Sequence, residues 1–387
     1  MSEEKNVPKL RFPGFTEPWE QRKLGEVATF INGRAYSQDE LLDEGKYKVL
    51  RVGNFYTNDS WYYSDLELPD KFYAQEGDLL YTWSATFGPH IWHGNKVIYH
   101  YHIWKVELSD KLDKTFTLQL LEEDKANILA NKNGSTMVHI TKEGMEQKQI
   151  SIPSSVQEQA QIGAYFEQLD NLITLHQRKL GHVKDLKKSM LQKMFPKNGE
   201  LYPEVRFPGF TAAWEQRKFS DLVQIERGGS PRPIDDFITD SPDGLNWVKI
   251  GDAPAQGNRI TKTAEKIKPE GLPKTKKVHP GDLILSNSMS FGKPYIMGID
   301  GCIHDGWLLI RNTNNVFDLT FLCRLLGTPQ MLNQYRSLAA GSTVNNLNKE
   351  LVGNTVVTIP KIDEQRVLGQ YLEQLDRLIT LHQRESE

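Results

Sequence analysis

Cysteine is almost missing from this chain. Among 387 residues there are only two, Cys302 and Cys323. Two cysteines are too few for a disulfide framework or for a cysteine-rich zinc cluster. We therefore expect domains that are held together by their own hydrophobic cores, and a function that depends on other side chains.

Long apolar runs are missing as well. No run approaches the roughly 18 residues that a membrane-spanning helix needs, and the N-terminal MSEEKNVPKLRF has no apolar stretch of the signal-peptide type. The composition, with 38% apolar and 25% charged residues and a net charge of −3, is that of a globular protein rather than a polycation. We expect a cytoplasmic protein without a membrane partner.

Signatures of catalysis are the third absence. The sequence contains no GxxxxGK[ST] phosphate loop, no GxGxxG after a predicted strand and no Asn-Pro-Pro-aromatic tetrapeptide. Pro242-Asp243 followed by Lys249 matches only part of a nuclease cluster, because a second carboxylate is not in place. We predict no catalytic residue and no cofactor of the chain's own.

Four histidines of the first half form a cluster that could suggest a metal. His90, His93, His100 and His102 alternate with aromatic residues, as side chains do along a strand. We interpret them as ordinary strand histidines and expect no metal site.

Two sequence blocks occur twice. Residues 167–178, EQLDNLITLHQR, return at 373–384 as EQLDRLITLHQR, with eleven of twelve letters identical. Residues 8–23, PKLRFPGFTEPWEQRK, return at 203–218 as PEVRFPGFTAAWEQRK. Such a long period indicates an internal repeat of a whole domain. The FPGF turn of the second block is interpreted as a structural staple that pins phenylalanine rings, and contact with a partner is the alternative.

The first repeated block carries a heptad pattern, in which apolar steps of three and four residues alternate. This pattern predicts two helices that each lie along another helix. The predicted pairing positions are Ile162, Phe166, Leu169, Ile173 and His176 in the first copy, and Leu368, Leu372, Leu375, Ile379 and His382 in the second. The polar histidines are expected to fix the register. Since the second copy has no counterpart of residues 179–194, we expect that part of the first helix to be unpaired.

The remaining pattern predicts a mixed α/β (α+β) protein. Ser155 and Glu158 form a capping box for a helix over 156–194, and Asp363 caps the second helix. Further helices are predicted at 115–130 and 319–338, and buried strands after the turns at Gly77-Asp78 and Gly281-Asp282. The predicted segments are a strand-rich domain 1–152, a central helix 153–197, a linker 198–205, a second strand-rich domain 206–360 and a short C-terminal helix 361–387.

Polar and aromatic side chains on predicted loops form the candidate nucleic-acid site, because Arg, Asn and Ser read base edges or hold phosphates. The candidates are Arg34, Tyr36, Arg51, Asn54, Tyr56, Trp83, Ser84, Ser135, Thr136, Arg227, Ser230, Arg232, Lys249, Asp252, Asn287, Ser288, Ser342 and Thr343. A basic stripe on the long helix is either a solvated face or a track for phosphates. It comprises Arg178, Lys179, Lys184, Lys187, Lys188, Lys193 and Lys197.

Two unlike domains, each between near-identical RFPGF…WEQRK and EQLD.LITLHQR segments, resemble the specificity (S) subunit of type I restriction–modification systems, the HsdS family. The resemblance covers essentially the whole chain. It implies two target-recognition domains that each read one half of a bipartite site on double-stranded DNA. It also implies that the two helices pack as an antiparallel coiled coil, related by a pseudo-twofold axis, and set the spacing between the half-sites.

The resemblance further implies partners. Two methyltransferase (modification) subunits dock on the repeated segments, and nuclease/translocase (restriction) subunits join them. S-adenosylmethionine, ATP and Mg²⁺ belong to these partners, and the specificity subunit itself is not catalytic. The alternative is a coiled-coil scaffold with two domains that bind ligands other than DNA. Salt-sensitive DNA binding separates the two hypotheses.

Overall fold

The computed structural model describes residues 7–56, 58–84, 86–131, 140–287, 291–339 and 346–386. The chain forms two compact units, Met1–Leu172 and Ile173–Glu387. Their boundary falls inside the long helix α3 (Val156–Lys193), so each unit includes one part of this helix. The sequence pattern predicts a helical segment separate from both domains, whereas in the structure the helix is divided between them.

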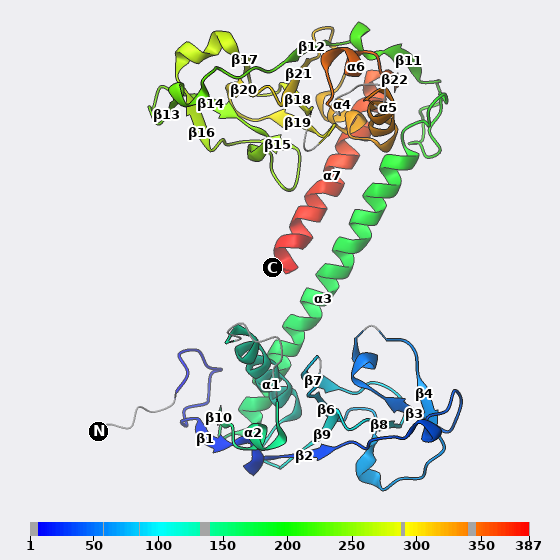
Figure 1. The fold of residues 1–387 in the computed structure, drawn as a ribbon, viewed down its shortest axis with the longest axis vertical. Coiled ribbons are helices and arrows are strands. Elements are labelled where there is room, and N and C mark those ends of the chain that lie inside the picture. Colours follow the sequence, from blue (N-terminus) through cyan, green and yellow to red (C-terminus); the bar gives the residue numbers. More distant parts are fainter. Residues whose placement is uncertain are drawn as a thin grey trace. The chain divides into compact units, whose positions relative to one another are not determined.

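The first unit contains two four-stranded sheets and one separate strand pair (Figure 1). The sheet orders are β2-β9-β6-β7 and β4-β3-β8-β5, and β1 pairs with β10. The strands are β1 (Glu20–Lys23), β2 (Ala28–Asn32), β3 (Tyr47–Leu50), β4 (Tyr62–Ser64), β5 (Tyr73–Ala74), β6 (Leu79–Thr82), β7 (Gly88–Ile91), β8 (Val97–Tyr99), β9 (Ile103–Leu108) and β10 (Gln149–Ile152). Helix α1 (Lys114–Ala130) packs against β7, and α2 (Lys142–Glu146) precedes β10.

The second unit repeats this plan with one more strand at an edge of each sheet. Its sheet orders are β12-β21-β18-β19-β15 and β13-β16-β14-β20-β17, and β11 pairs with β22. The strands are β11 (Glu215–Lys218), β12 (Gln224–Arg227), β13 (Ile238–Thr239), β14 (Leu245–Val248), β15 (Arg259–Ile260), β16 (Glu265–Ile267), β17 (Lys276–Val278), β18 (Leu283–Ser286), β19 (Pro294–Met297), β20 (Gly301–Ile303), β21 (Trp307–Arg311) and β22 (Val356–Ile359). The helices are α4 (Leu319–Leu326), α5 (Pro329–Ala339), α6 (Lys349–Gly353) and α7 (Ile362–Ser386).

Strands β6 and β18 are buried on both faces, which confirms the buried strands predicted after the Gly-Asp turns. In β6, Leu79 and Tyr81 belong to one core and Leu80 to another. In β18 the alternation is the same, with Ile284 in a different core from its neighbours. Because successive side chains of a strand point to opposite faces, each strand joins the two sheets of its unit.

Two helix predictions differ from the structure. The helix predicted over 319–338 is broken into α4 and α5, since Pro329 has no amide hydrogen for a helix interior and fits only the first turn of a new helix. Asp363 is not a cap, because α7 already begins at Ile362 and the carboxylate accepts a hydrogen bond from Arg366. At the start of α3, the Glu158 amide donates to the Ser155 hydroxyl at 3.4 Å, but the Glu158 carboxylate does not turn back.

That carboxylate is the centre of the predicted staple. Arg11 of the first RFPGF block donates two hydrogen bonds to Glu158, at 2.6 and 2.8 Å, and the Glu158 side chain is fully buried. Arg206 of the second block holds Glu364 in the same way, with both distances 2.7 Å. The ring of Phe12 packs edge-to-face on a tyrosine of α3 in the first unit, as a phenylalanine does on α7 in the second. The FPGF block is therefore a structural staple, as predicted.

A buried glutamine beside each carboxylate extends the staple. The Gln159 side chain accepts from the Asp113 amide at 2.9 Å and donates to the Lys111 and Pro153 carbonyls, both at 2.9 Å. Gln365 makes the equivalent three hydrogen bonds in the second unit, at 3.0–3.1 Å. Each glutamine thus joins the start of the long helix to the start of α1 or α4. Sequence reasoning did not single out either residue.

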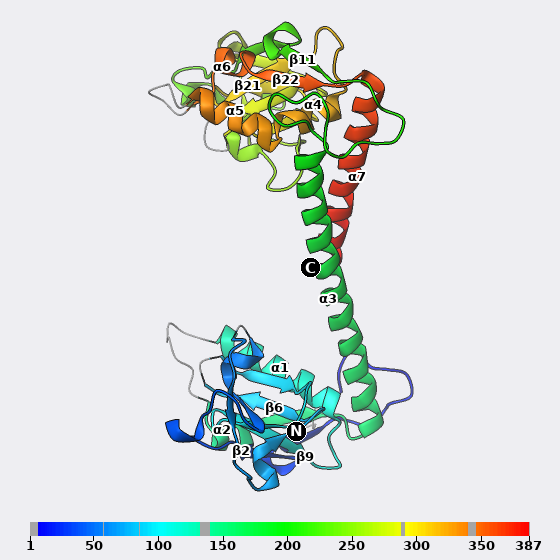
Figure 2. The same cartoon turned by 90° about the vertical axis from the view of Figure 1, so that its right-hand side faces the viewer.

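Within the second unit, the C-terminal part of α3 and α7 lie side by side and run antiparallel (Figures 1 and 2). His176 meets His382, with 3.2 Å between the Nδ1 atoms, and Lys187 pairs with Asp376. On α7, Leu368, Leu372 and Leu375 are buried in the core that Met194 also joins. The heptad positions of the second helix therefore face inward as predicted.

The first-copy pairing positions require a correction. Phe166, Leu169 and Ile173 are 45%, 36% and 38% exposed, and Ile162 packs against the core of the first unit. In an antiparallel pair, α7 reaches along α3 only from Met194 back to His176. The prediction that residues 179–194 lack a partner is wrong for the same reason, because this segment is the paired one.

Within the described residues, no helix is both long and apolar enough to cross a bilayer.

A first prediction tests the close approach of α1 to α3. A Cβ atom on Gly163 would lie 2.6 Å from the Phe116 backbone nitrogen, whereas one on Gly181 of the same helix meets nothing within 4 Å. Gly163→Ala should cost about 1–3 kcal/mol through overpacking. Gly181→Ala should leave stability unchanged or add about 0.5–1 kcal/mol. Thermal unfolding followed by circular dichroism compares the two, and equal melting temperatures would contradict this packing.

A second prediction tests the corrected helix pairing. Leu375 is 4% exposed and Leu169 is 36% exposed, although both occupy the same position of the repeated block. Leu375→Asp buries an unpaired carboxylate and should cost about 3–5 kcal/mol. Leu169→Asp should change stability by less than about 1 kcal/mol. Chemical denaturation of both variants measures this, and an equal loss would favour the pairing expected from the sequence.

Candidate nucleic-acid interface

In the first unit, the candidate Trp83 lies at the turn between β8 and β9. The ring of Trp83 lies 5.0 Å from His102 and 6.2 Å from Tyr101, and its Nε1 donates to the Tyr101 carbonyl at 3.0 Å. His100 lies 4.9 Å from His102. We call residues 100–102 with Trp83 the aromatic turn. It presents partly exposed ring faces of the kind that contact bases and sugars.

The interpretation of the four first-half histidines as strand residues is wrong for three of them. Only His90 lies in a strand, whereas His100 forms an isolated bridge, His102 lies in a turn, and His93 follows the end of β7. The cause is the tight β8–β9 connection, which interrupts the alternation of side chains after Tyr99. Burial, followed by the nearby His102 and Arg51, lowers the pKa of His100 to about 4.

Arg51 and Asn54 shape the loop beside the aromatic turn. Arg51 lies 4.3 Å from the ring centroid of Tyr62 and donates to the Ser60 carbonyl at 3.2 Å, while its buried Nε has no hydrogen-bond partner. Asn54 donates to the carbonyls of Asn58 and Ser60 at 2.9 and 3.0 Å. Asn54 therefore fixes the loop, and Arg51 is the cation that the loop presents.

The other first-unit candidates are placed differently. Arg34 is held by Glu40 through hydrogen bonds of 2.9 and 2.6 Å and lies over the ring of Tyr36. Burial raises the pKa of the Tyr36 hydroxyl, so it stays neutral. The charge of Arg34 is thus already matched within the protein. Ser84 is partly buried in the β6–β7 connection.

Tyr56 lies beside a half-buried histidine. Its hydroxyl is 3.2 Å from Nε2 of His90, whose ring stacks on Phe55 with 4.1 Å between centroids. Burial, followed by the charge of Lys125, lowers the pKa of His90 to about 4. His90 is therefore neutral at physiological pH and supports Tyr56 from beneath.

In the second unit, four candidates converge on Asp305 in the turn between β20 and β21. The Ser230 hydroxyl donates to its carboxylate at 2.7 Å, and Arg232 lies 4.0 Å away. The Asn287 amide and Arg227 donate to its backbone carbonyl at 2.8 and 3.5 Å. Burial opposes ionisation of Asp305, but the Ser230 hydroxyl, the nearby His304 and Arg232 outweigh it, so the pKa of Asp305 lies below its ordinary value.

A cleft of 680 Å³ opens beside Asp305, lined among others by Ser230, Arg232, Lys249 and His304. Lys249 pairs with Glu265 across it. Asp252 accepts from the Lys249 amide at 2.7 Å and from the Ala264 amide at 2.9 Å, so its carboxylate holds the loop. The structure thus brings Ser230, Arg232 and Lys249 together, and gives Asp252 a supporting place.

Two glycines bring the preceding strands close to these turns. A Cβ atom on Gly33 would lie 2.6 Å from the Tyr99 carbonyl oxygen, and one on Gly228 would lie 2.9 Å from that of Ile303. Neither position accepts a side chain without a shift of the backbone. The glycines therefore fix both turns at the same place on the two sheets.

Sequence reasoning missed the residues of the two turns, above all Tyr101 and Asp305. One signal was available. The offset of 204 that relates Phe87-Gly88 to Phe291-Gly292 also relates His100 to His304. The candidates Ser135, Thr136, Ser288, Ser342 and Thr343 lie outside the described residues.

The basic stripe of α3 is partly neutralised. Lys187 pairs with Asp376, while Lys193 and Lys197 lie 3.1 and 3.9 Å from Glu204. Its other members, Arg178, Lys179, Lys184 and Lys188, are exposed. Lys187, Lys193 and Lys197 are therefore paired within the protein, whereas the other four basic side chains remain exposed at the surface.

A third prediction uses the half-buried His90. The unfolded side chain takes up a proton below about pH 6.5, whereas the folded one does so only near pH 4. His90 therefore contributes stability that is fully present above pH 6.5 and is lost as the pH falls toward 4. His90→Phe, which keeps the ring stack, should remove about 1–3 kcal/mol of this pH dependence. Denaturation at pH 7.5 and 4.5 measures it; the exposed His93→Phe is the control, and an unchanged slope in His90→Phe would contradict the prediction.

Comparison with known proteins matches both halves of the chain. The family model described as "Type I restriction modification DNA specificity domain" matches residues 16–185 and 212–387. The type I restriction enzyme MjaVIII specificity subunit of Methanocaldococcus jannaschii is 24% identical over 399 residues, which cover 99% of this chain and 91% of the relative. The EcoBI specificity subunit of Escherichia coli is 21% identical over 381 residues, covering 93% and 79%.

A solved structure shows the same fold. The S subunit of a type I restriction-modification system from M. genitalium superimposes with a TM-score of 0.61 and 16% sequence identity, covering 98% of this chain and 95% of that one. Since the specificity domain is matched twice, once over each sheet framework and the turn that it carries, the chain belongs to the type I restriction–modification specificity family.

Proposed function

We propose that this protein is the DNA sequence-specificity subunit of a type I restriction–modification complex, and that each unit reads one half of a bipartite site on double-stranded DNA. One observation carries the proposal: two units of the same topology present different side chains at the same turn. The β8–β9 turn offers rings and the β20–β21 turn offers a carboxylate with cations around it. Equal frameworks with unlike reading surfaces suit two unlike half-sites.

The second-unit turn has the chemistry of direct base readout. The Asp305 carboxylate is ionised and one-third exposed. It can therefore accept a hydrogen bond from the N4 amino group of cytosine or the N6 amino group of adenine. The Arg232 side chain, which is 76% exposed, suits the O6 and N7 acceptors of guanine. In the first unit, Arg51 and the aromatic turn suit phosphate, sugar and base faces.

The repeated staples support the partner proposal. Each unit displays the same RFPGF block against the same helix start, so one partner surface is presented twice. Two methyltransferase subunits would dock there, one for each half-site, and nuclease/translocase subunits would join them. In this proposal S-adenosylmethionine, ATP and Mg²⁺ act in those subunits. This chain contributes recognition and no catalytic residue.

A fourth prediction tests the reading role of the second unit. Arg232→Ala, in complexes reconstituted with the methyltransferase subunits, should weaken DNA binding about 5- to 150-fold, as expected for one base contact of about 1–3 kcal/mol. It should also relax the sequence of one half-site only, as measured by methylome sequencing. Arg377→Ala is the matched control, since that side chain is 75% exposed and also pairs with a carboxylate.

Two results would contradict the proposal. Equal effects of Arg232→Ala and Arg377→Ala would mean that bulk charge, rather than reading, is lost. DNA binding that does not fall as salt rises would favour the scaffold alternative, because phosphate contacts release counterions.

A further inference from the structure

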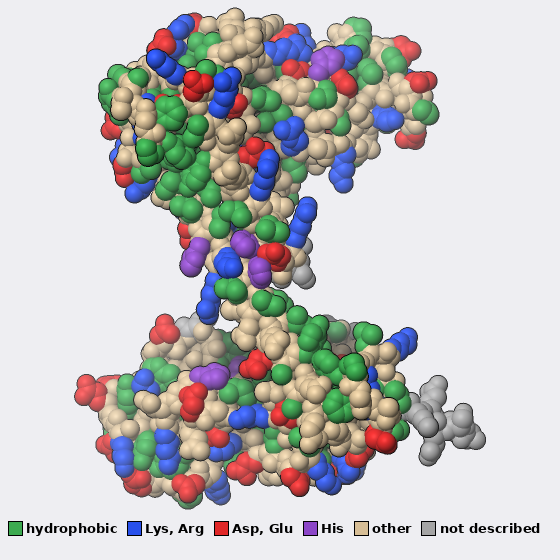
Figure 3. Space-filling view, turned by 180° about the vertical axis from the view of Figure 1, so that it is seen from behind, with side chains coloured by type: hydrophobic (Ala, Val, Ile, Leu, Met, Phe, Trp, Pro, Cys, Tyr) green, Lys and Arg blue, Asp and Glu red, His purple; other side chains and the backbone are tan. Residues whose placement is uncertain are grey.

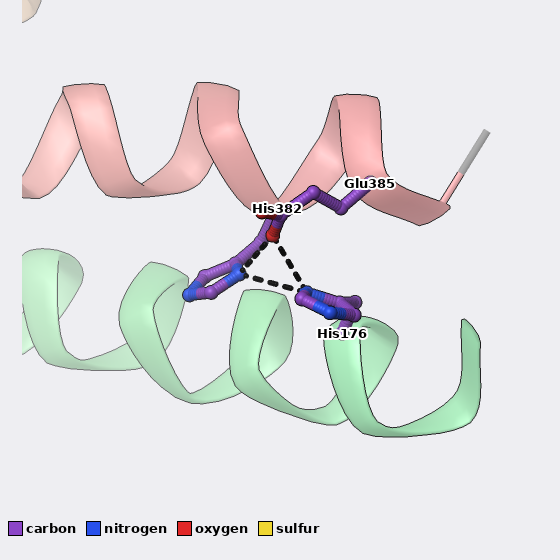
Figure 4. A group of neighbouring side chains, drawn as sticks. All are labelled: His176, His382 and Glu385. Atoms are coloured by element: carbon purple, nitrogen blue, oxygen red, sulfur yellow. Dashed lines mark hydrogen bonds and ion pairs between the residues drawn. The ribbon is translucent and has the colours of Figure 1, made fainter. Parts of the chain in front are cut away.

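Three metal-ligand atoms meet where α7 ends against α3 (Figure 4). Nδ1 of His176 lies 3.2 Å from Nδ1 of His382 and 2.7 Å from Oε2 of Glu385. Nδ1 of His382 lies 3.1 Å from the same carboxylate oxygen. His176 comes from α3, while His382 and Glu385 lie one turn apart on α7. These three ligand atoms lie close enough together to hold one metal ion.

The triangle of donor atoms fits a tetrahedral ion. Zn²⁺ binds histidine nitrogen and carboxylate oxygen at about 2.0–2.2 Å, so neighbouring ligand atoms lie about 3.3 Å apart. The measured edges of 3.2, 3.1 and 2.7 Å approach this value. An ion about 2.1 Å from all three atoms would lie about 1 Å outside their plane, leaving a fourth position for water.

We propose that His176, His382 and Glu385 form a binding site for a divalent transition metal, Zn²⁺ in the first place, that clamps the end of α7 to α3. Two imidazoles and one carboxylate are a ligand set that Zn²⁺ uses elsewhere. The bound ion would join two helices whose pairing otherwise rests on packing and on the Lys187–Asp376 ion pair.

The repeat explains how the site arises. His176 and His382 occupy the same place in the two LITLHQR segments, and the antiparallel pairing brings these places together. Three residues on, the copies differ: the first has Lys179 and the second has Glu385. The pair of histidines therefore gains one carboxylate rather than two.

The surroundings allow both binding and access. The side chains of His176 and His382 are 20% and 14% exposed, and Glu385 is 38% exposed. In the space-filling view, histidine side chains reach the surface of the helix pair (Figure 3). The nitrogens are thus largely shielded from water, and the open side of the site lies at the carboxylate.

The competing explanation is a hydrogen-bonded trio, in which a shared proton rather than an ion joins the three groups. The probe that separates them is the metal alone. Untagged full-length protein is stripped with a chelator and titrated with ZnCl₂, and separately with CoCl₂, whose visible absorption reports tetrahedral coordination. We expect one equivalent of Zn²⁺ per chain and a rise in Tm of about 5 °C or more at about 100 times the Kd.

The variants are His382→Gln and Glu385→Gln, with His182→Gln as the matched control, an exposed histidine further along α3. The Zn²⁺-dependent rise should vanish in His382→Gln, fall by more than half in Glu385→Gln and persist in His182→Gln. Glu385→Gln keeps a hydrogen-bond acceptor, and its metal-free Tm shows whether folding is intact. Absence of a Zn²⁺ effect in the wild-type protein, or its persistence in His382→Gln, would overturn the proposal.

Discussion

The buried pair of carboxylate and guanidinium at the start of each long helix is the interaction on which the framework depends. Glu158 is fully buried, and Arg11, from a block 147 positions away, gives it two hydrogen bonds. Removing one partner of such a pair costs about 3–5 kcal/mol, because the other charge stays buried without compensation. The chain forms this pair twice, with Arg206 and Glu364 in the second unit.

From this pair the geometry passes outward to the β8–β9 and β20–β21 turns. The strand after each RFPGF block pairs with the strand before the long helix in the same register, Glu20 opposite Ile152 and Glu215 opposite Ile359. The neighbouring glutamine fixes the start of α1 or α4, and these helices pack against β7 and β19. The sheets then carry the β8–β9 and β20–β21 turns. A fixed frame with a variable turn lets sequence preference change without loss of the fold.

Sequence patterns predicted the parts that rest on local or repeated signals. The repeat, α3 from Val156, the buried strands and the staple all follow from periodicity and identical letters. The pairing partner of each helix segment was beyond reach, because a heptad pattern marks a face without naming what covers it. Asp305 was missed because its role comes from the convergence of side chains from two other segments, 227–232 and the end of β18 at Asn287, and no local pattern records such a meeting.

In both copies the repeated EQLD segment packs on the domain of its own half, and the second copy, on α7, also packs on a second helix. One face grips the domain of its own half: Asp170 accepts from Gln119 of α1 at 3.1 Å, and Asp376 pairs with Arg324 of α4. The partner of Asp170 is thus a neutral amide and that of Asp376 a guanidinium. Lys187 from α3 also approaches Asp376, so this carboxylate lies between two cations. The other face of the second copy, with Leu375 and His382, meets the C-terminal part of α3. A substitution at Leu375 in the second copy therefore disturbs both the domain and the helix pair, whereas Leu169, at the same place in the first copy, is exposed.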